Sequence, residues 1–71
     1  MPTIHIIGAI RILMYFNDHA PPHFHAAYNE YEALISIHSL AVLRGSLPRT
    51  QQKIVLSWAK ANQEFLMTKW S

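Results

Sequence analysis

The stretch of this sequence best equipped for chemistry is a run of histidines and prolines in its first half. His19, His23 and His25 are three of the five histidines, and Pro21 and Pro22 lie between the first and the second. Proline fixes φ and removes a backbone donor, so the stretch is expected to be a stiff loop. Imidazoles held in a stiff loop can bind a metal ion or transfer protons near neutral pH.

Metal binding is one chemistry open to these side chains. If residues 23–28 form a strand, His23 and His25 project from the same face and can reach one ion. His19 or Asp18 could supply a further ligand from the loop. Imidazole and carboxylate suit a divalent transition metal such as Zn or Ni. The spacing matches no diagnostic zinc motif, so structural or surface histidines are the competing interpretation.

Acid–base cleavage of RNA is the second chemistry open to these side chains. One histidine would take the proton of a 2′-hydroxyl, a second group would protonate the leaving oxygen, and an arginine would offset the phosphate charge. The candidate catalytic residues of such a metal-independent endoribonuclease are His19, His23, His25, Tyr15 and Arg11. Histidine and tyrosine on strands often only pack, so the alternative is a sheet face without catalysis.

These side chains would be positioned by a sheet. Alternation of apolar and polar residues predicts four strands, at residues 9–16, 23–28, 31–37 and 40–44, with Gly45-Ser46 ending the last. Asn29-Glu30 is expected to be a tight turn. That turn would pair Tyr28 with Tyr31, Ala26 with Ala33, and Phe24 with Ile35. Matching apolar faces across the proline loop would place Phe16 opposite Phe24 and Tyr15 opposite His25.

The rest of the sequence predicts one helix, with Ser46 as its N-cap and Pro48 in its first turn. Apolar residues at helical spacing define its expected core stripe: Leu47, Ile54, Trp58, Ala61 and Phe65, with Val55 flanking. The fold class is therefore α+β. An antiparallel meander of three to four strands, four in the expected order, carries one C-terminal helix on one face, in a single ββββα domain spanning residues 1–71.

The sheet face without the helix is expected to be neither plainly polar nor plainly apolar. It would carry Arg11, Leu13, Tyr15, His23, His25, Glu32, Leu34 and Leu43. Leu56 and Met67 fall off the expected helix stripe and indicate apolar surface left for a partner or a second copy. Trp70 also falls off that stripe, so it would dock onto a neighbouring chain or fold back.

Composition limits the alternatives. The chain has 71 residues, no cysteine, a net charge of +2 and 51% hydrophobic residues, so a partner or a second copy is expected to complete its core. A charge of this size does not by itself argue for an anionic partner. His5, Gly8 and Arg11 interrupt the apolar N-terminal stretch, so neither a signal peptide nor a membrane span is expected, and the cytoplasm is the expected location.

Several motifs occur together along the chain: Met1–Ile4, Tyr15–His19, Pro21–His25, Glu30–Ile35, Gly45–Arg49 and Trp58. In this combination the chain resembles a small prokaryotic family, family 4160 of the domains of unknown function. The resemblance implies one component of a type II toxin–antitoxin pair, bound in the cytoplasm to the small protein encoded beside it. Two functions are expected from residues and resemblance together. One is a toxin that acts on RNA, and the other is a non-catalytic protein-binding or regulatory module that could use the same histidines for metal.

Overall fold

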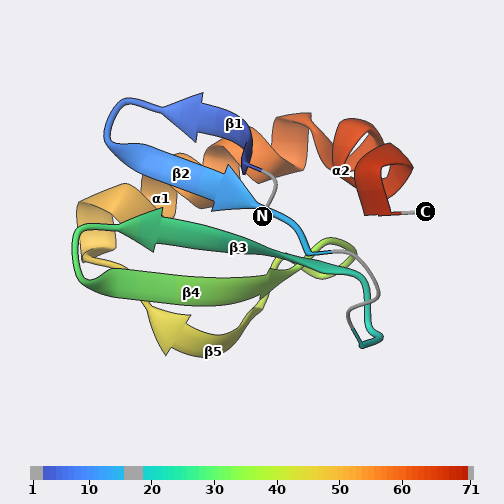
Figure 1. The fold of residues 1–71 in the computed structure, drawn as a ribbon, viewed down its shortest axis with the longest axis horizontal. Coiled ribbons are helices and arrows are strands. Elements are labelled where there is room, and N and C mark those ends of the chain that lie inside the picture. The colour runs from blue at the N-terminus through green and yellow to red at the C-terminus, as the bar shows by residue number, and fades with distance from the viewer. Residues whose placement is uncertain (1–2, 16–18, 71) are drawn as a thin grey trace.

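The computed structural model describes residues 3–15 and 19–70 of the chain (Figure 1). Within them the element order is β1 (Thr3–Ile7), β2 (Ile10–Leu13), β3 (His23–Tyr28), β4 (Tyr31–Ser36), β5 (Val42–Ser46), α1 (Arg49–Ala61) and α2 (Gln63–Trp70). The strands form one antiparallel sheet in sequential order, and the helices lie across one of its faces (Figure 1). The α+β class is confirmed. The expectation of four strands and one helix is wrong, because the described residues form five strands and two helices.

The strand absent from the sequence expectation is β1, which pairs with β2 across a turn at Gly8 and Ala9. Its ladder is irregular between Thr3 and His5, where a bulge interrupts the register. A bulge places consecutive residues on one side of a strand, so the two-residue alternation that reveals a strand is lost. For this reason the segment could not be recognised from its apolar pattern.

The hairpin of β3 and β4 follows the predicted register. Phe24 lies opposite Ile35 and Tyr28 opposite Tyr31, and Asn29 takes the positive φ of 53° that a tight turn requires. The register of β2 against β3 differs from the expectation, because His25 lies opposite Leu13 and not opposite Tyr15. A shift of two residues leaves every side chain on its predicted face, so hydrophobic patterning cannot distinguish the two registers. The expected partner of Phe24, Phe16, lies outside the described residues.

The helical part begins later than expected and is interrupted. Ser46 and Gly45 belong to β5, and the N-cap is Pro48, which has an extended backbone and no side-chain oxygen to offer. The helix stops at Asn62, whose side-chain Nδ2 donates to the Trp58 carbonyl at 2.8 Å and whose backbone N–H donates to Ala59. This residue therefore separates α1 from α2.

The hydrophobic core lies between the helices and one face of the sheet, and it includes only part of the predicted helix stripe. Leu47 is buried and Trp58 packs against the core, as predicted. Val55, Ala59 and Leu66 are fully buried against the strands. Ile54 and Phe65 of the predicted stripe are 41% and 37% exposed. The run Ile54-Val55-Leu56 is apolar at three successive positions, so periodicity alone does not decide which one faces the sheet.

Two further residues of the helices have a different role from the expected one. Leu56 and Met67 pack against the core, although the sequence indicated that they were surface left for a partner. Across the described ranges, 3–15 and 19–70, no helix is long and apolar enough to span a membrane.

The two glycines with positive φ provide a matched test of the β4–β5 contact. Gly8 has φ +58° and open space where a Cβ would be, whereas a Cβ on Gly45, at φ +73°, would overlap the carbonyl oxygen of Glu32. We expect Gly8→Ala to lower the free energy of unfolding by about 1 kcal/mol through backbone strain alone. Gly45→Ala is expected to lower it by about 3 kcal/mol, because steric conflict with the neighbouring strand adds to the strain. Urea unfolding of both variants measures the difference, and equal losses would show that β5 moves away from β4 at little cost.

Candidate functional site

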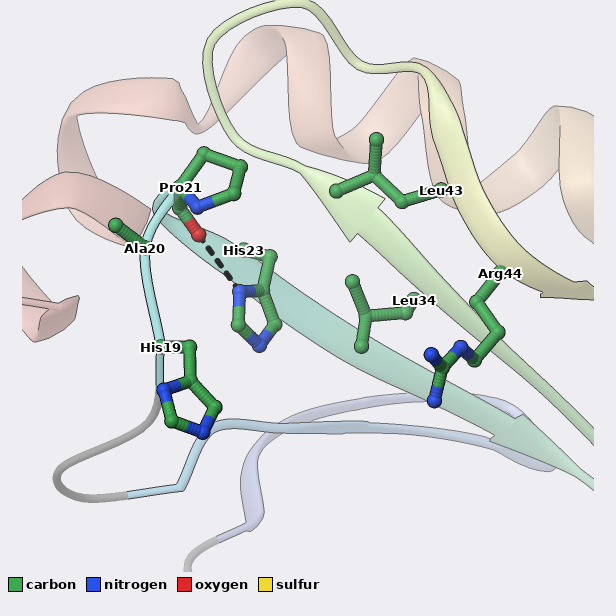
Figure 2. Close-up of a pocket in the computed structure, with 7 residues that line it drawn as sticks. All are labelled: His19, Ala20, Pro21, His23, Leu34, Leu43 and Arg44. Carbon is green, nitrogen blue, oxygen red and sulfur yellow. Dashed lines mark hydrogen bonds between the residues drawn. The ribbon is translucent and has the colours of Figure 1, made fainter.

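A pocket of about 290 Å³ opens on the sheet face that the helices leave uncovered (Figure 2). It is lined by His19, Ala20, Pro21, His23, Leu34, Leu43 and Arg44. Figure 2 shows the two imidazoles on the loop side and the guanidinium on the opposite side, with the two leucines nearby. The histidine–proline loop, β3, β4 and β5 therefore all contribute side chains to one depression.

The loop is tied to the sheet at its second proline. The Pro22 carbonyl accepts a hydrogen bond of 3.0 Å from the backbone N–H of Ile37, the residue that follows β4. The next residue, His23, begins β3, so its backbone direction is set by the strand ladder. The predicted stiff loop is thus anchored directly before His23.

His23 is more deeply buried than His19 and His25. Its Nδ1 lies 2.7 Å from the Pro21 carbonyl oxygen, and its side chain is only 5% exposed. A carbonyl oxygen can only accept, so Nδ1 carries the hydrogen of this bond. The Trp70 ring packs against the imidazole with centroids 5.0 Å apart. Of the two roles predicted for Trp70, folding back onto its own chain is confirmed.

His25 belongs to a cluster beside the pocket. Its Nδ1 donates to Glu32 Oε2 at 3.1 Å, and the Tyr15 ring meets it edge-on with centroids 4.5 Å apart. The His23 ring lies 5.4 Å away by centroid. The structure therefore brings together Tyr15, His23 and His25, as predicted, and adds a carboxylate that orients one imidazole. Glu32 is exposed, so this pair contributes little to stability.

The arginine at the pocket is not the predicted one. Arg11 lies opposite Ala27, is exposed, and is not among the residues that line the pocket. Arg44 lines it instead, opposite Leu34. The register of β5 shifts at this point, with Leu34 opposite Arg44 and Ile35 opposite Val42, so Leu43 is the extra residue of a bulge. The bulge lets Leu43 and Arg44 both line the pocket, which strict alternation would forbid.

The predicted metal ligands are only partly assembled. His23 and His25 share a face as expected, but their Nδ1 atoms are hydrogen-bonded to Pro21 and Glu32. In the portions of the chain that the structure describes, no group of three or more histidine, aspartate or glutamate side chains could hold a metal ion. Asp18, the fourth predicted ligand, lies outside those portions. The set His19, His23, His25 and Asp18 for Zn or Ni therefore stays a prediction.

The fold and pocket define a small α+β protein with a histidine-bearing face opposite its helices. Comparison with known families shows where it belongs: residues 9–71 match the family described as "Domain of unknown function (DUF4160)". The chain is a member of that family, and the resemblance drawn from its motifs is confirmed. No curated protein matches the chain, and no solved structure matches it either.

The two histidines of the pocket should differ sharply in their effect on folding. His23→Ala removes a buried hydrogen bond and the ring that packs on Trp70, so we expect it to lower the free energy of unfolding by about 2–3 kcal/mol. His19 is exposed, and His19→Ala is expected to change the free energy of unfolding by no more than about 0.5 kcal/mol. Urea unfolding followed by tryptophan fluorescence measures both. A near-neutral His23→Ala would mean that the bond to Pro21 is not retained in solution.

Proposed function

We propose that this chain is the RNA-directed component of a toxin–antitoxin-type pair and that its pocket receives the phosphodiester group at which RNA is cleaved. One observation carries the proposal: two imidazoles, from His19 and His23, line the same pocket as the guanidinium of Arg44. An anion-binding group and two proton-transfer groups around one depression are the set that metal-independent phosphodiester cleavage uses.

The chemistry follows from the residue types. The guanidinium can bind two phosphate oxygens at once and offset the charge that grows on them. One imidazole takes the proton of the 2′-hydroxyl as its oxygen attacks phosphorus. The other, as an imidazolium, gives a proton to the departing 5′-oxygen. The products are a 2′,3′-cyclic phosphate and a free 5′-hydroxyl, and the reaction needs the 2′-hydroxyl that DNA lacks.

The neighbouring residues have supporting roles in this proposal. Leu34 and Leu43 offer apolar surface to a ribose or a base beside the phosphate. His25 packs next to His23 and limits the directions in which its ring can turn, and Tyr15 packs against His25. Arg44 takes the role that the sequence assigned to Arg11.

The pairing and the location are part of the same proposal. The motifs Asp18-His19 and Pro21–His25 resemble those of the family, and its members are typically encoded beside a second small protein. This resemblance supports a complex between the chain and the small protein encoded beside it. A protein directed at cellular RNA would act in the cytoplasm. Whether the chain also forms a homo-oligomer is tested by the mass measurement described below.

A second candidate function is a protein-binding or regulatory module without catalysis. The observation that favours it is the 48% exposure of Leu43 at the pocket rim. Exposed apolar side chains of this size suit a protein partner better than a phosphate. The same module could hold Zn or Ni through the histidines of the loop.

The cleavage assay uses an oligodeoxynucleotide that contains a single ribonucleotide, with fluorophores at both ends. We expect the chain to cut after the ribonucleotide and to leave the all-DNA strand intact. His19→Ala is expected to lower the cleavage rate at least about 100-fold, because proton transfer by a positioned side chain contributes about that much. His23→Asn, which keeps a donor near the Pro21 carbonyl but removes Nε2, is expected to lower it similarly.

Arg44→Gln and Arg49→Gln form a matched pair for the phosphate contact. Arg49 is exposed on α1, away from the pocket, so its substitution should leave cleavage unchanged, while Arg44→Gln should weaken RNA binding at least about tenfold. Equal rates for wild type, His19→Ala and His23→Asn would overturn the proposal and indicate a contaminating nuclease. Binding of the neighbouring gene's product without any RNA cleavage would favour the second candidate.

A further inference from the structure

The helices carry a second apolar stripe beside the one that is buried against the sheet. It consists of Ile54, Trp58, Ala61 and Phe65, of which Ile54 and Phe65 are more than one-third exposed and Trp58 is half-buried. These residues recur at helical spacing across the junction between α1 and α2. One stripe suffices to attach helices to a sheet, and Val55, Ala59 and Leu66 already provide it. Ile54, Ala61 and Phe65 of this outer stripe are therefore apolar surface that the fold leaves exposed, while Trp58 also packs against the core.

The outer stripe is continuous and held in place by ring contacts. His5 of β1 stacks on Trp58 with centroids 4.7 Å apart and planes 12° apart. Trp58 in turn meets Phe65 edge-on at 6.4 Å, and the Lys69 ammonium lies 5.7 Å from the centroid of the Phe65 ring. These contacts fix the aromatic side chains before any partner arrives, which lowers the entropy cost of binding.

Trp58 also connects the outer stripe to the interior. Its ring meets the fully buried Phe24 of β3 edge-on, with centroids 6.4 Å apart. A side chain anchored in the core on one side and half-exposed on the other presents a rigid apolar surface. Aromatic residues of this kind dominate the binding energy of protein interfaces.

The charge of the helices favours one kind of partner for the outer stripe. The helices bear Arg49, Lys53, Lys60 and Lys69, all exposed, against one acidic residue, Glu64. A second copy of the chain laid on this stripe would bring the lysines of both copies together, and like charges brought close cost binding energy. A partner whose apolar residues are flanked by carboxylates would meet the lysines with opposite charge.

We propose that the stripe of Ile54, Trp58 and Phe65 docks an acidic amphipathic helix of a partner protein. The partner would place apolar side chains at i, i+4 and i+7 on the stripe, with aspartate and glutamate at its flanks against Lys53, Lys60 and Lys69. The helices cover one face of the sheet (Figure 1), and the pocket opens on the other (Figure 2), so this contact leaves the pocket uncovered. The inference does not depend on RNA cleavage.

The test is a titration of the isotope-labelled protein, observed by amide chemical shifts, with two helical peptides of about 18 residues. Both carry leucine at i, i+4 and i+7 spacing. One has glutamate at the remaining positions and the other has lysine. We expect the glutamate peptide to bind at least about tenfold more tightly, to lose affinity as salt is added, and to shift amides of α1 and α2.

Two isoleucines give the matched variants. Ile54→Ser removes an exposed side chain from the stripe and is expected to weaken the glutamate peptide at least about tenfold. Ile6→Ser makes the same change at a more exposed position on β1 and is expected to have no effect. Because both side chains are exposed, both variants should fold, and their amide spectra verify this before the titration.

Three results would overturn the proposal. Equal affinity for the two peptides would show that the lysines of the helices do not select an acidic partner. Shifts confined to the pocket face, or equal losses from Ile54→Ser and Ile6→Ser, would place the contact elsewhere. A dimer of the chain alone in native mass spectrometry, dissociated by Ile54→Ser, would show that a second copy occupies the stripe. The cleavage assay is unaffected by any of these outcomes, so the two proposals fail separately.

Discussion

The alternation of side chains along β3 and β4 is the constraint on which both faces of this molecule depend. Phe24, Ala26, Ala33 and Ile35 point to the helices and are almost fully buried, so the residues between them must point to the other face. A slip of one residue would exchange the core for the histidines. The pocket face therefore exists in its present form because the opposite face is packed.

The same constraint explains which parts of the fold could be predicted from the sequence. Faces follow from alternation, and the β3–β4 hairpin follows from its turn at Asn29, so both were predicted. The register of β2 could not be, because a two-residue shift preserves every face. β1 could not be predicted, because its bulge breaks the alternation of side chains along the strand. The sequence does not indicate which of Ile54, Val55 and Leu56 is buried, because only the position of the sheet decides this.

At the candidate site, the histidines could be predicted from their clustering in the sequence, but the arginine could not be predicted from its position on a strand. His19 and His23 could be named because histidines cluster so closely in the chain, and the structure places both at one pocket. The arginine could not be named, since a bulge at Leu43 turns Arg44 into the pocket. The contact between Trp70 and His23 joins residues far apart in the chain, and no local pattern reports such a contact.

That contact has a consequence for the order in which the molecule is assembled during synthesis. His23 leaves the ribosome well before α2 does, yet its imidazole is covered by Trp70 in the last turn of that helix. The sheet can pair as its strands emerge, because each strand lies beside the one made just before it. The pocket acquires its packed histidine only after α2 has been made and has docked. A fragment of the chain that ends before α2 would thus contain every strand of the sheet but lack the ring that packs on His23.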